Sequence, residues 1–145
     1  MCSSVENRQK SMIENFNTLG DWEQKYDYII SLAQELPSFP PSKKNHKYII
    51  EGCQSQVWFD FSLEKDKIFF QGQSDSVLVS GLISLLIKIY SGVSPKSIIH
   101  SNTDFINCMG LAKHLSVTRH NGLNQILTHI YSISDKVSNN KIPHN

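Results

Sequence analysis

The chain has 145 residues, of which 39% are hydrophobic, and a formal net charge of +1 at pH 7. This length and apolar content suit a single core, so the sequence predicts one domain over residues 1–145. Acidic and basic residues are interspersed and the longest apolar segment, residues 77–90, contains Lys88 and is too short to span a bilayer, so we expect neither a nucleic-acid nor a membrane partner.

Two amphipathic helices are predicted in the first quarter of the chain. The first ends at Gly20, and the polar residues that precede it predict a flexible tail at residues 1–9. Asp21 is placed to cap the second helix, whose apolar residues recur at helical spacing up to Leu36. Prolines and a polar run then predict an exposed connector over residues 37–45.

Three short strands are predicted after the connector. Ile49 and Ile50 are β-branched, residues 57–63 alternate between apolar and polar, and residues 68–71 return after a polar turn. The polar residues 52–55 lie between the first two strands. The sequence therefore predicts a small antiparallel sheet of about three strands, with a loop that the sheet holds at both ends.

The second half of the chain is predicted to be helical. Residues 77–90 form a helix that is apolar on nearly every side, so we expect it at the centre of the packing. Ser94 is placed to cap a short helix and Ser116 to cap a long last one. Residues 138–145 predict a second flexible tail, which leaves an ordered core of about residues 10–137 in an α+β fold.

Three cysteines, Cys2, Cys53 and Cys108, share no CxxC spacing, which is unlike a disulfide framework or a zinc site. Free thiols are typical of a reducing compartment, and residues 1–6 lack the basic and then apolar run of a secretory signal. We therefore expect a cytoplasmic protein. Cys2 lies in the predicted tail, and Cys108 is interpreted as a packing residue.

Cys53 is the candidate for chemistry because it lies in the predicted loop. Gly52 removes a side chain from the approach to its sulfur, although cysteine is also among the most buried residue types and Cys53 could be a small core residue. A free thiol has a pKa of about 8.5, so a nucleophilic cysteine needs a cation nearby. The sequence contains no phosphate-binding glycine pattern and no Gly-x-Ser-x-Gly elbow, which leaves thiol chemistry by elimination.

Three other polar residues have both a functional and a structural interpretation. Arg119 has a permanent charge that favours a thiolate or persulfide anion, or it is simply solvated. His114 is either a base or a capping or core histidine. Asp75 precedes the central helix, where capping alone explains a carboxylate.

The heptad Gly52-Cys53-Gln54-Ser55-Gln56-Val57-Trp58 resembles the signature of the SufE family of sulfur acceptors, which includes the CsdE-type paralogues. Further matches follow in chain order. They are Trp22-Glu23-Gln24-Lys25-Tyr26, Gly72-Gln73-Ser74-Asp75, and Leu111-Ala112-Lys113-His114-Leu115-Ser116 with Arg119. The resemblance covers about residues 10–137 and implies a SufE/IscU-like α+β domain. The segment 104–108 departs from the family pattern, in which a more aromatic and acidic version is usual.

The resemblance implies that Cys53 takes sulfane sulfur from the persulfide of a SufS-like cysteine desulfurase. This stimulates the conversion of L-cysteine to L-alanine, and the sulfur then passes to a scaffold that assembles iron–sulfur clusters. The protein would be no autonomous enzyme and would hold no cofactor or metal, since pyridoxal phosphate belongs to the desulfurase; a homodimer is possible. The supporting or partner-contact candidates are Gly52, Gln54, Asp75, His114 and Arg119.

The resemblance also implies that an apolar pocket shields the cysteine between partners, and Trp58 with the aromatic face of the strand could line it. Two alternatives stay open. Cys53 with His114 as its base would make a thiol hydrolase. A metal or cluster scaffold would need several converging cysteines, whereas Cys53 alone lies in a predicted loop.

Overall fold

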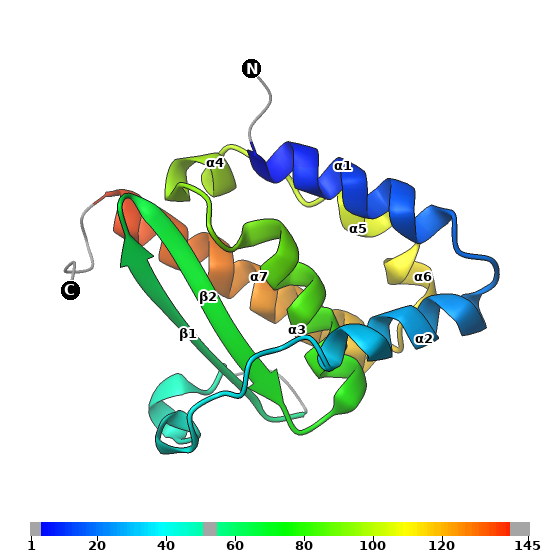
Figure 1. Cartoon of the computed structure of the whole chain (residues 1–145), viewed down its shortest axis with the longest axis horizontal. Helices are drawn as coiled ribbons and strands as arrows, with labels where there is room; N and C mark the ends of the chain where they lie inside the picture. The colour runs from blue at the N-terminus through cyan, green and yellow to red at the C-terminus, as the bar shows by residue number, and fades with distance from the viewer. Residues whose placement is uncertain (1–3, 51–54, 140–145) are drawn as a thin grey trace.

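The computed structural model describes residues 4–50 and 55–139. It confirms an α+β fold in which, over these ranges, seven α-helices accompany one two-stranded antiparallel sheet (Figure 1). In chain order the elements are α1 (Ser4–Asn17), α2 (Trp22–Ala33), the short 3-10 helices η1 (Pro41–Lys43) and η2 (His46–Tyr48), β1 (Val57–Glu64), β2 (Lys67–Ser74), α3 (Val77–Tyr90), α4 (Pro95–Ile99), α5 (Phe105–Cys108), α6 (Leu111–His114) and α7 (Val117–Ser138).

The sheet is a hairpin. β1 and β2 pair in antiparallel register, from Val57 opposite Ser74 at one end to Glu64 opposite Lys67 at the other. The two residues between the strands have positive φ angles of 50° and 66°, as expected for a tight hairpin turn that follows the twist of its strands. The predicted alternation of residues 57–63 therefore corresponds to a real strand.

The expected third strand is wrong for the described residues. Ile49 forms a single antiparallel bridge with Trp58 and does not extend into a strand. The reason is local, because η2 ends at Tyr48 and leaves only Ile49 and Ile50 before residue 51. The backbone of the connector thus pairs with β1 through one isolated bridge beside the loop.

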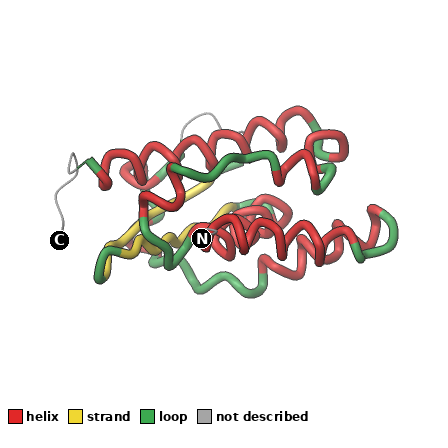
Figure 2. The backbone as a smooth tube through the Cα atoms, turned by 90° about the horizontal axis from the view of Figure 1, so that it is seen from above, coloured by secondary structure: helices red, strands yellow, loops and turns green. Residues whose placement is uncertain are grey.

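α3 lies at the centre of the fold, as predicted. It packs against α2, β2, α1 and α7, and most of its side chains are buried. Figure 2 shows α7 running along one side of the molecule and the N-terminal helices along the other. Neither α3 nor any other helix in the described ranges is long and apolar enough to cross a membrane.

The predicted flexible tail at residues 1–9 is wrong for the part that the structure describes, because α1 begins at Ser4. Val5 is fully buried. Arg8 donates hydrogen bonds to main-chain carbonyls at the end of α3, and Gln9 donates one to the Asn102 carbonyl at 2.8 Å. These polar side chains fix the first turns of α1, and an apolar pattern does not reveal such contacts.

The helix starts agree with the predicted caps. Asp21, Ser94 and Ser116 each accept a hydrogen bond from a backbone N–H in the first turn of the helix that follows. At α3 the cap is Ser76, whose side chain accepts from the Val79 N–H at 3.3 Å. Asp75 is therefore not the cap of α3, and its carboxylate has a different partner.

His129 on α7 faces the sheet, with its ring 5.9 Å from the ring of Phe59. Burial lowers the pKa of His129 below 6.5, and the charge of Lys136 lowers it further. At pH values between the folded and the unfolded pKa, the unfolded chain binds more protons than the folded one. Titration of His129 therefore leaves the free energy of unfolding undiminished above pH 6.5 and lowers it as the pH decreases below 6.5.

His129→Gln is expected to flatten the pH dependence of the free energy of unfolding on the acidic side of neutrality, because glutamine does not titrate there. Urea unfolding of both proteins at several pH values between about 5 and 7.5 measures the two slopes. Equal slopes in the wild type and the variant would show that burial of His129 does not disfavour its protonation.

Candidate functional site

Backbone pairing joins the two ends of the cysteine loop. The Ile50 N–H donates a hydrogen bond to the Val57 carbonyl at 2.9 Å, and Ile49 bridges Trp58. The predicted loop is therefore held at both ends, and the paired positions close the segment 51–56. The site candidates Gly52, Cys53 and Gln54 lie outside the described residues.

Asp75 holds the exit of this loop. Its carboxylate accepts a hydrogen bond from the Gln56 N–H at 3.1 Å, and its own N–H donates to the Gln56 carbonyl at 3.3 Å. The Ser74 hydroxyl donates to the same carbonyl at 2.7 Å. Both main-chain polar groups of Gln56 are thus bound by the last residues of β2 and the turn after it, which fixes where the loop rejoins the sheet.

Asp75→Ala is expected to loosen this attachment. The variant loses one acceptor at an exposed position, so the cost in the free energy of unfolding is about 1 kcal/mol. The main effect is local, and hydrogen exchange of the Gln56 amide should become faster. Asp75→Asn is the matched control, since its side chain keeps an acceptor oxygen. Unchanged exchange at Gln56 in the alanine variant would contradict this role.

A small pocket of about 20 Å³ lies beside the described end of the loop, between α3 and α7. That volume has room for about one water-sized group. Apart from Ser55, Thr118 and Arg119 its lining is aliphatic or glycine. The lining residues are Ser55, Val57, Val79, Leu82, Thr118, Arg119, Gly122, Leu123 and Ile126.

The lining of this pocket differs from the aromatic one expected from the sequence. Trp58 is not among the lining residues, because its ring faces the connector, where the Lys44 ammonium lies 5.5 Å from the ring centre. Phe59 instead stacks on Phe70 at a distance of 5.5 Å between ring centres. The pocket beside the described end of the loop is therefore lined mainly by aliphatic side chains of α3 and α7 and by Val57.

Arg119 combines exposure with a position at this pocket. It lies in the first turn of α7, where the Ser116 hydroxyl accepts a hydrogen bond from its N–H at 3.2 Å. No carboxylate in residues 4–50 or 55–139 forms a salt bridge with its guanidinium. A cation is thus available at the pocket for an anion on the loop or on a partner.

His114 belongs to a different part of the molecule. Its ring stacks on Trp22, with centres 3.8 Å apart and planes within 9°, and its Nδ1 lies 3.1 Å from the Gly110 carbonyl. The Tyr26 hydroxyl donates a hydrogen bond to the His114 carbonyl. These contacts join α6 to α2, and His114 does not line the pocket beside Ser55. The structure therefore brings Asp75 and Arg119, but not His114, to the described surroundings of the loop.

The interpretation of Cys108 as a packing residue is wrong, because Cys108 is exposed. The buried residues of α5 and its end are Phe105, Ile106 and Met109, which share one face of the single turn and leave Cys108 to the side. In the part of the chain that the structure describes, no three His, Cys, Asp or Glu side chains gather as a metal site would require.

Comparison with known proteins connects this arrangement to a family. The model of the SufE domain, described as an Fe–S metabolism associated domain, matches residues 10–134. The fold is similar to the solution structure of a hypothetical protein from Thermus thermophilus, with a TM-score of 0.76 and 20% sequence identity over 94% of this chain and 97% of that one. The chain therefore belongs to the SufE family, and its domain assigns it a role in iron–sulfur metabolism.

Proposed function

We propose that this protein accepts sulfane sulfur on Cys53 from the persulfide of a SufS-like cysteine desulfurase and passes it on for iron–sulfur cluster assembly. The observation that carries the proposal is the SufE domain match over residues 10–134, which includes the cysteine heptad. The paired loop ends and the Asp75 attachment support it, since they hold the flanks of that heptad in place.

Chain geometry limits how far Cys53 lies from the described part of the site. Two peptide bonds separate it from Ser55, so their Cα atoms are no more than roughly 7 Å apart. Ser55 lines the small pocket together with Arg119. An aliphatic surface and a positive charge therefore lie at the described end of the loop that carries Cys53.

The transfer step requires no oxidant. The Cys53 thiolate attacks the outer sulfur of the donor persulfide, a new S–S bond forms at Cys53, and the donor S–S bond breaks as its electron pair leaves on the inner sulfur. The donor returns to a thiolate and Cys53 becomes a persulfide. The rate depends on the thiolate fraction and on access, and the guanidinium of Arg119 favours the anion.

The small pocket suits the interval in which the protein carries the persulfide, after the donor has released the sulfur and before the acceptor takes it. Its volume of about 20 Å³ accommodates one small group, and its aliphatic walls keep out the thiols that would reduce a persulfide. Burial raises a thiol pKa, so a thiol shielded at this pocket would have to become exposed before it reacts efficiently. Docking of the desulfurase is the event that we assign to this step.

Peptide mass analysis tests the proposal directly. After incubation with a cysteine desulfurase and L-cysteine under non-reducing conditions, the Cys53 peptide should gain one sulfur atom and the peptide of exposed Cys108 should not. An unmodified Cys53 beside an active desulfurase would contradict the proposal. Turnover of an ester or amide by the isolated protein would instead support a thiol hydrolase.

A further inference from the structure

The connector between α2 and β1 carries a cluster of basic residues. Lys43, Lys44, His46 and Lys47 fall within five positions, and residues 37–50 include no acidic side chain. The protein as a whole is nearly neutral, with a net charge of +1. Positive charge is therefore concentrated on the segment that leads directly into the cysteine loop.

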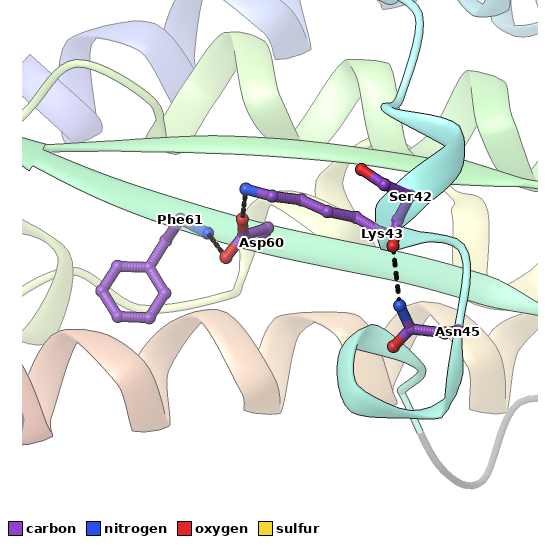
Figure 3. Close-up of polar contacts among 5 residues, drawn as sticks. All are labelled: Ser42, Lys43, Asn45, Asp60 and Phe61. Atoms are coloured by element: carbon purple, nitrogen blue, oxygen red, sulfur yellow. Dashed lines mark hydrogen bonds and ion pairs between the residues drawn. The ribbon is translucent and has the colours of Figure 1, made fainter.

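Lys43 fixes the connector to the sheet. Its ammonium lies 2.6 Å from the carboxylate of Asp60 on β1, and the other oxygen of that carboxylate accepts the Phe61 N–H at 2.8 Å (Figure 3). Asn45 joins η1 to η2, because its amide donates to the Ser42 carbonyl at 2.8 Å and its oxygen accepts the Lys47 N–H at 3.0 Å. These contacts tie the backbone that presents Lys44 and Lys47 to β1 and link η1 to η2.

Lys44 and Lys47 differ from Lys43 in having no carboxylate partner among the described residues. Both are exposed. Each ammonium lies 5.5 Å from an aromatic ring centre, Lys44 over Trp58 and Lys47 over Tyr48. The rings restrict these side chains before any partner arrives, which reduces the conformational entropy lost on binding.

A groove of about 480 Å³ is lined by Lys44 and reaches Asp75, which holds the loop exit. Lys44 lines it together with Asp75, the residue that binds the backbone of Gln56. Val77, which is 61% exposed, belongs to the same lining. The remaining walls are mixed. Their apolar side comes from the end of α2 and the proline-rich start of the connector, including Leu36, Pro37 and Phe39, and their polar side comes from Ser38, Gln73, Ser74 and Ser80.

Building on the proposed function, we infer that Lys44, Lys47 and this groove form a docking surface for an acidic segment of the sulfur-donor protein, with an apolar side chain of that segment in the groove. Two observations select this occupant. In residues 4–50 and 55–139 the two lysines have no carboxylate partner, which favours an acidic occupant, and the groove shares Asp75 with the loop attachment, so a protein bound there contacts the residue that holds the loop exit.

Single-stranded nucleic acid fits this surface less well. Such sites use open aromatic faces on which bases stack, together with several phosphate contacts. Here the protein's own lysines cover the rings of Trp58 and Tyr48, and the indole Nε1 of Trp58 is buried. A protein carboxylate can reach the exposed ammonium groups without displacing them from the rings.

The test is a charge-reversal pair, Lys44→Glu with Lys47→Glu. Its matched control is Lys10→Glu with Lys96→Glu, which changes the net charge equally at exposed positions on α1 and α4. The concentration that half-saturates stimulation of desulfurase turnover is measured at increasing salt. At low salt the test pair should raise this concentration about tenfold while the maximal rate is kept, and the control should match the wild type.

Added salt should raise the half-saturating concentration of the wild type towards that of the Lys44/Lys47 variant, because the attraction that the variant lacks is electrostatic. Equal half-saturation of the Lys44/Lys47 pair and the wild type would overturn the docking surface, while sulfur on Cys53 of the same wild-type sample would leave the proposed function standing. A wild type that takes up no sulfur would overturn the function itself. Thermal melts check folding, and Lys44→Gln with Lys47→Gln should show a smaller shift in the same direction.

Binding of a single-stranded oligonucleotide is the competing outcome. If the Lys44/Lys47 charge reversal abolishes oligonucleotide binding but leaves the half-saturating concentration for the desulfurase unchanged, the surface serves nucleic acid and the inference is overturned. The protein docking surface is supported if the wild type binds no oligonucleotide at physiological salt and the charge reversal raises the half-saturating concentration for the desulfurase.

Discussion

Cys53→Ser is expected to abolish sulfur uptake and the stimulation of desulfurase turnover, while the variant still binds the desulfurase. A serine hydroxyl cannot attack a sulfane sulfur to form a persulfide, so the rate of transfer should fall by at least about a thousandfold. Binding should persist because the docking contacts that we assign to Lys44 and Lys47 do not involve the sulfur. Peptide mass analysis and a co-purification assay measure the two properties separately.

The matched control for this variant is Cys108→Ser. Cys108 is an exposed cysteine on α5, and it lines neither the small pocket beside the loop nor the groove beside Lys44. Its replacement should leave sulfur uptake at the wild-type level. If Cys53→Ser also loses binding, the cysteine matters for the shape of the loop, and if Cys108→Ser removes the added sulfur, the acceptor has been assigned to the wrong thiol.

Gly81→Ala is expected to destabilise the fold by about 3 kcal/mol, near the upper end of the usual cost of overpacking. A Cβ atom at Gly81 would lie 2.1 Å from the carbonyl oxygen of Ile29 and 2.8 Å from its carbonyl carbon. These are backbone atoms of α2, so no side-chain rotation relieves the clash and the two helices must separate. Urea unfolding measures the loss.

Gly122→Ala provides the comparison, because a Cβ there would meet no described atom within 4 Å. Alanine is the better helix former, so this variant should gain up to about 1 kcal/mol in the interior of α7. A Gly81→Ala protein with an unchanged unfolding midpoint would mean that α2 and α3 are free to move apart, contrary to their close packing around Gly81.

The spacing of apolar residues predicted the helices and strands that are stabilised by burying one face, or all faces, in the core. The alternation of β1, the uniformly apolar α3 and the stripe of α7 are all present, and so are the caps at Asp21, Ser94 and Ser116. The start of α1 was missed because Arg8 and Gln9 are held by hydrogen bonds to distant carbonyls. Long-range polar contacts of this kind leave no periodic signal.

The site was predictable where it depended on local pattern. The loop between paired ends agrees with the sequence interpretation. Asp75 was explained as a helix cap and instead binds the Gln56 N–H, and His114 was grouped with the site and in fact stacks on Trp22. The basic connector was visible as a run of lysines but was interpreted only as exposed. Which lysine is neutralised depends on Asp60, a strand residue 17 positions from Lys43, and only the fold reveals that pairing.

The position of Trp58 has a spectroscopic consequence. The protein has two tryptophans, and Trp22 lies against His114 in the contact between α2 and α6. Trp58 instead lies beneath Lys44, next to the residues that close the loop. Indole emission responds to charges near the ring, so rearrangement of that ammonium alters the fluorescence of Trp58. Trp58 is therefore an intrinsic fluorescent reporter at the surface where we infer that the sulfur donor docks, and no dye has to be attached.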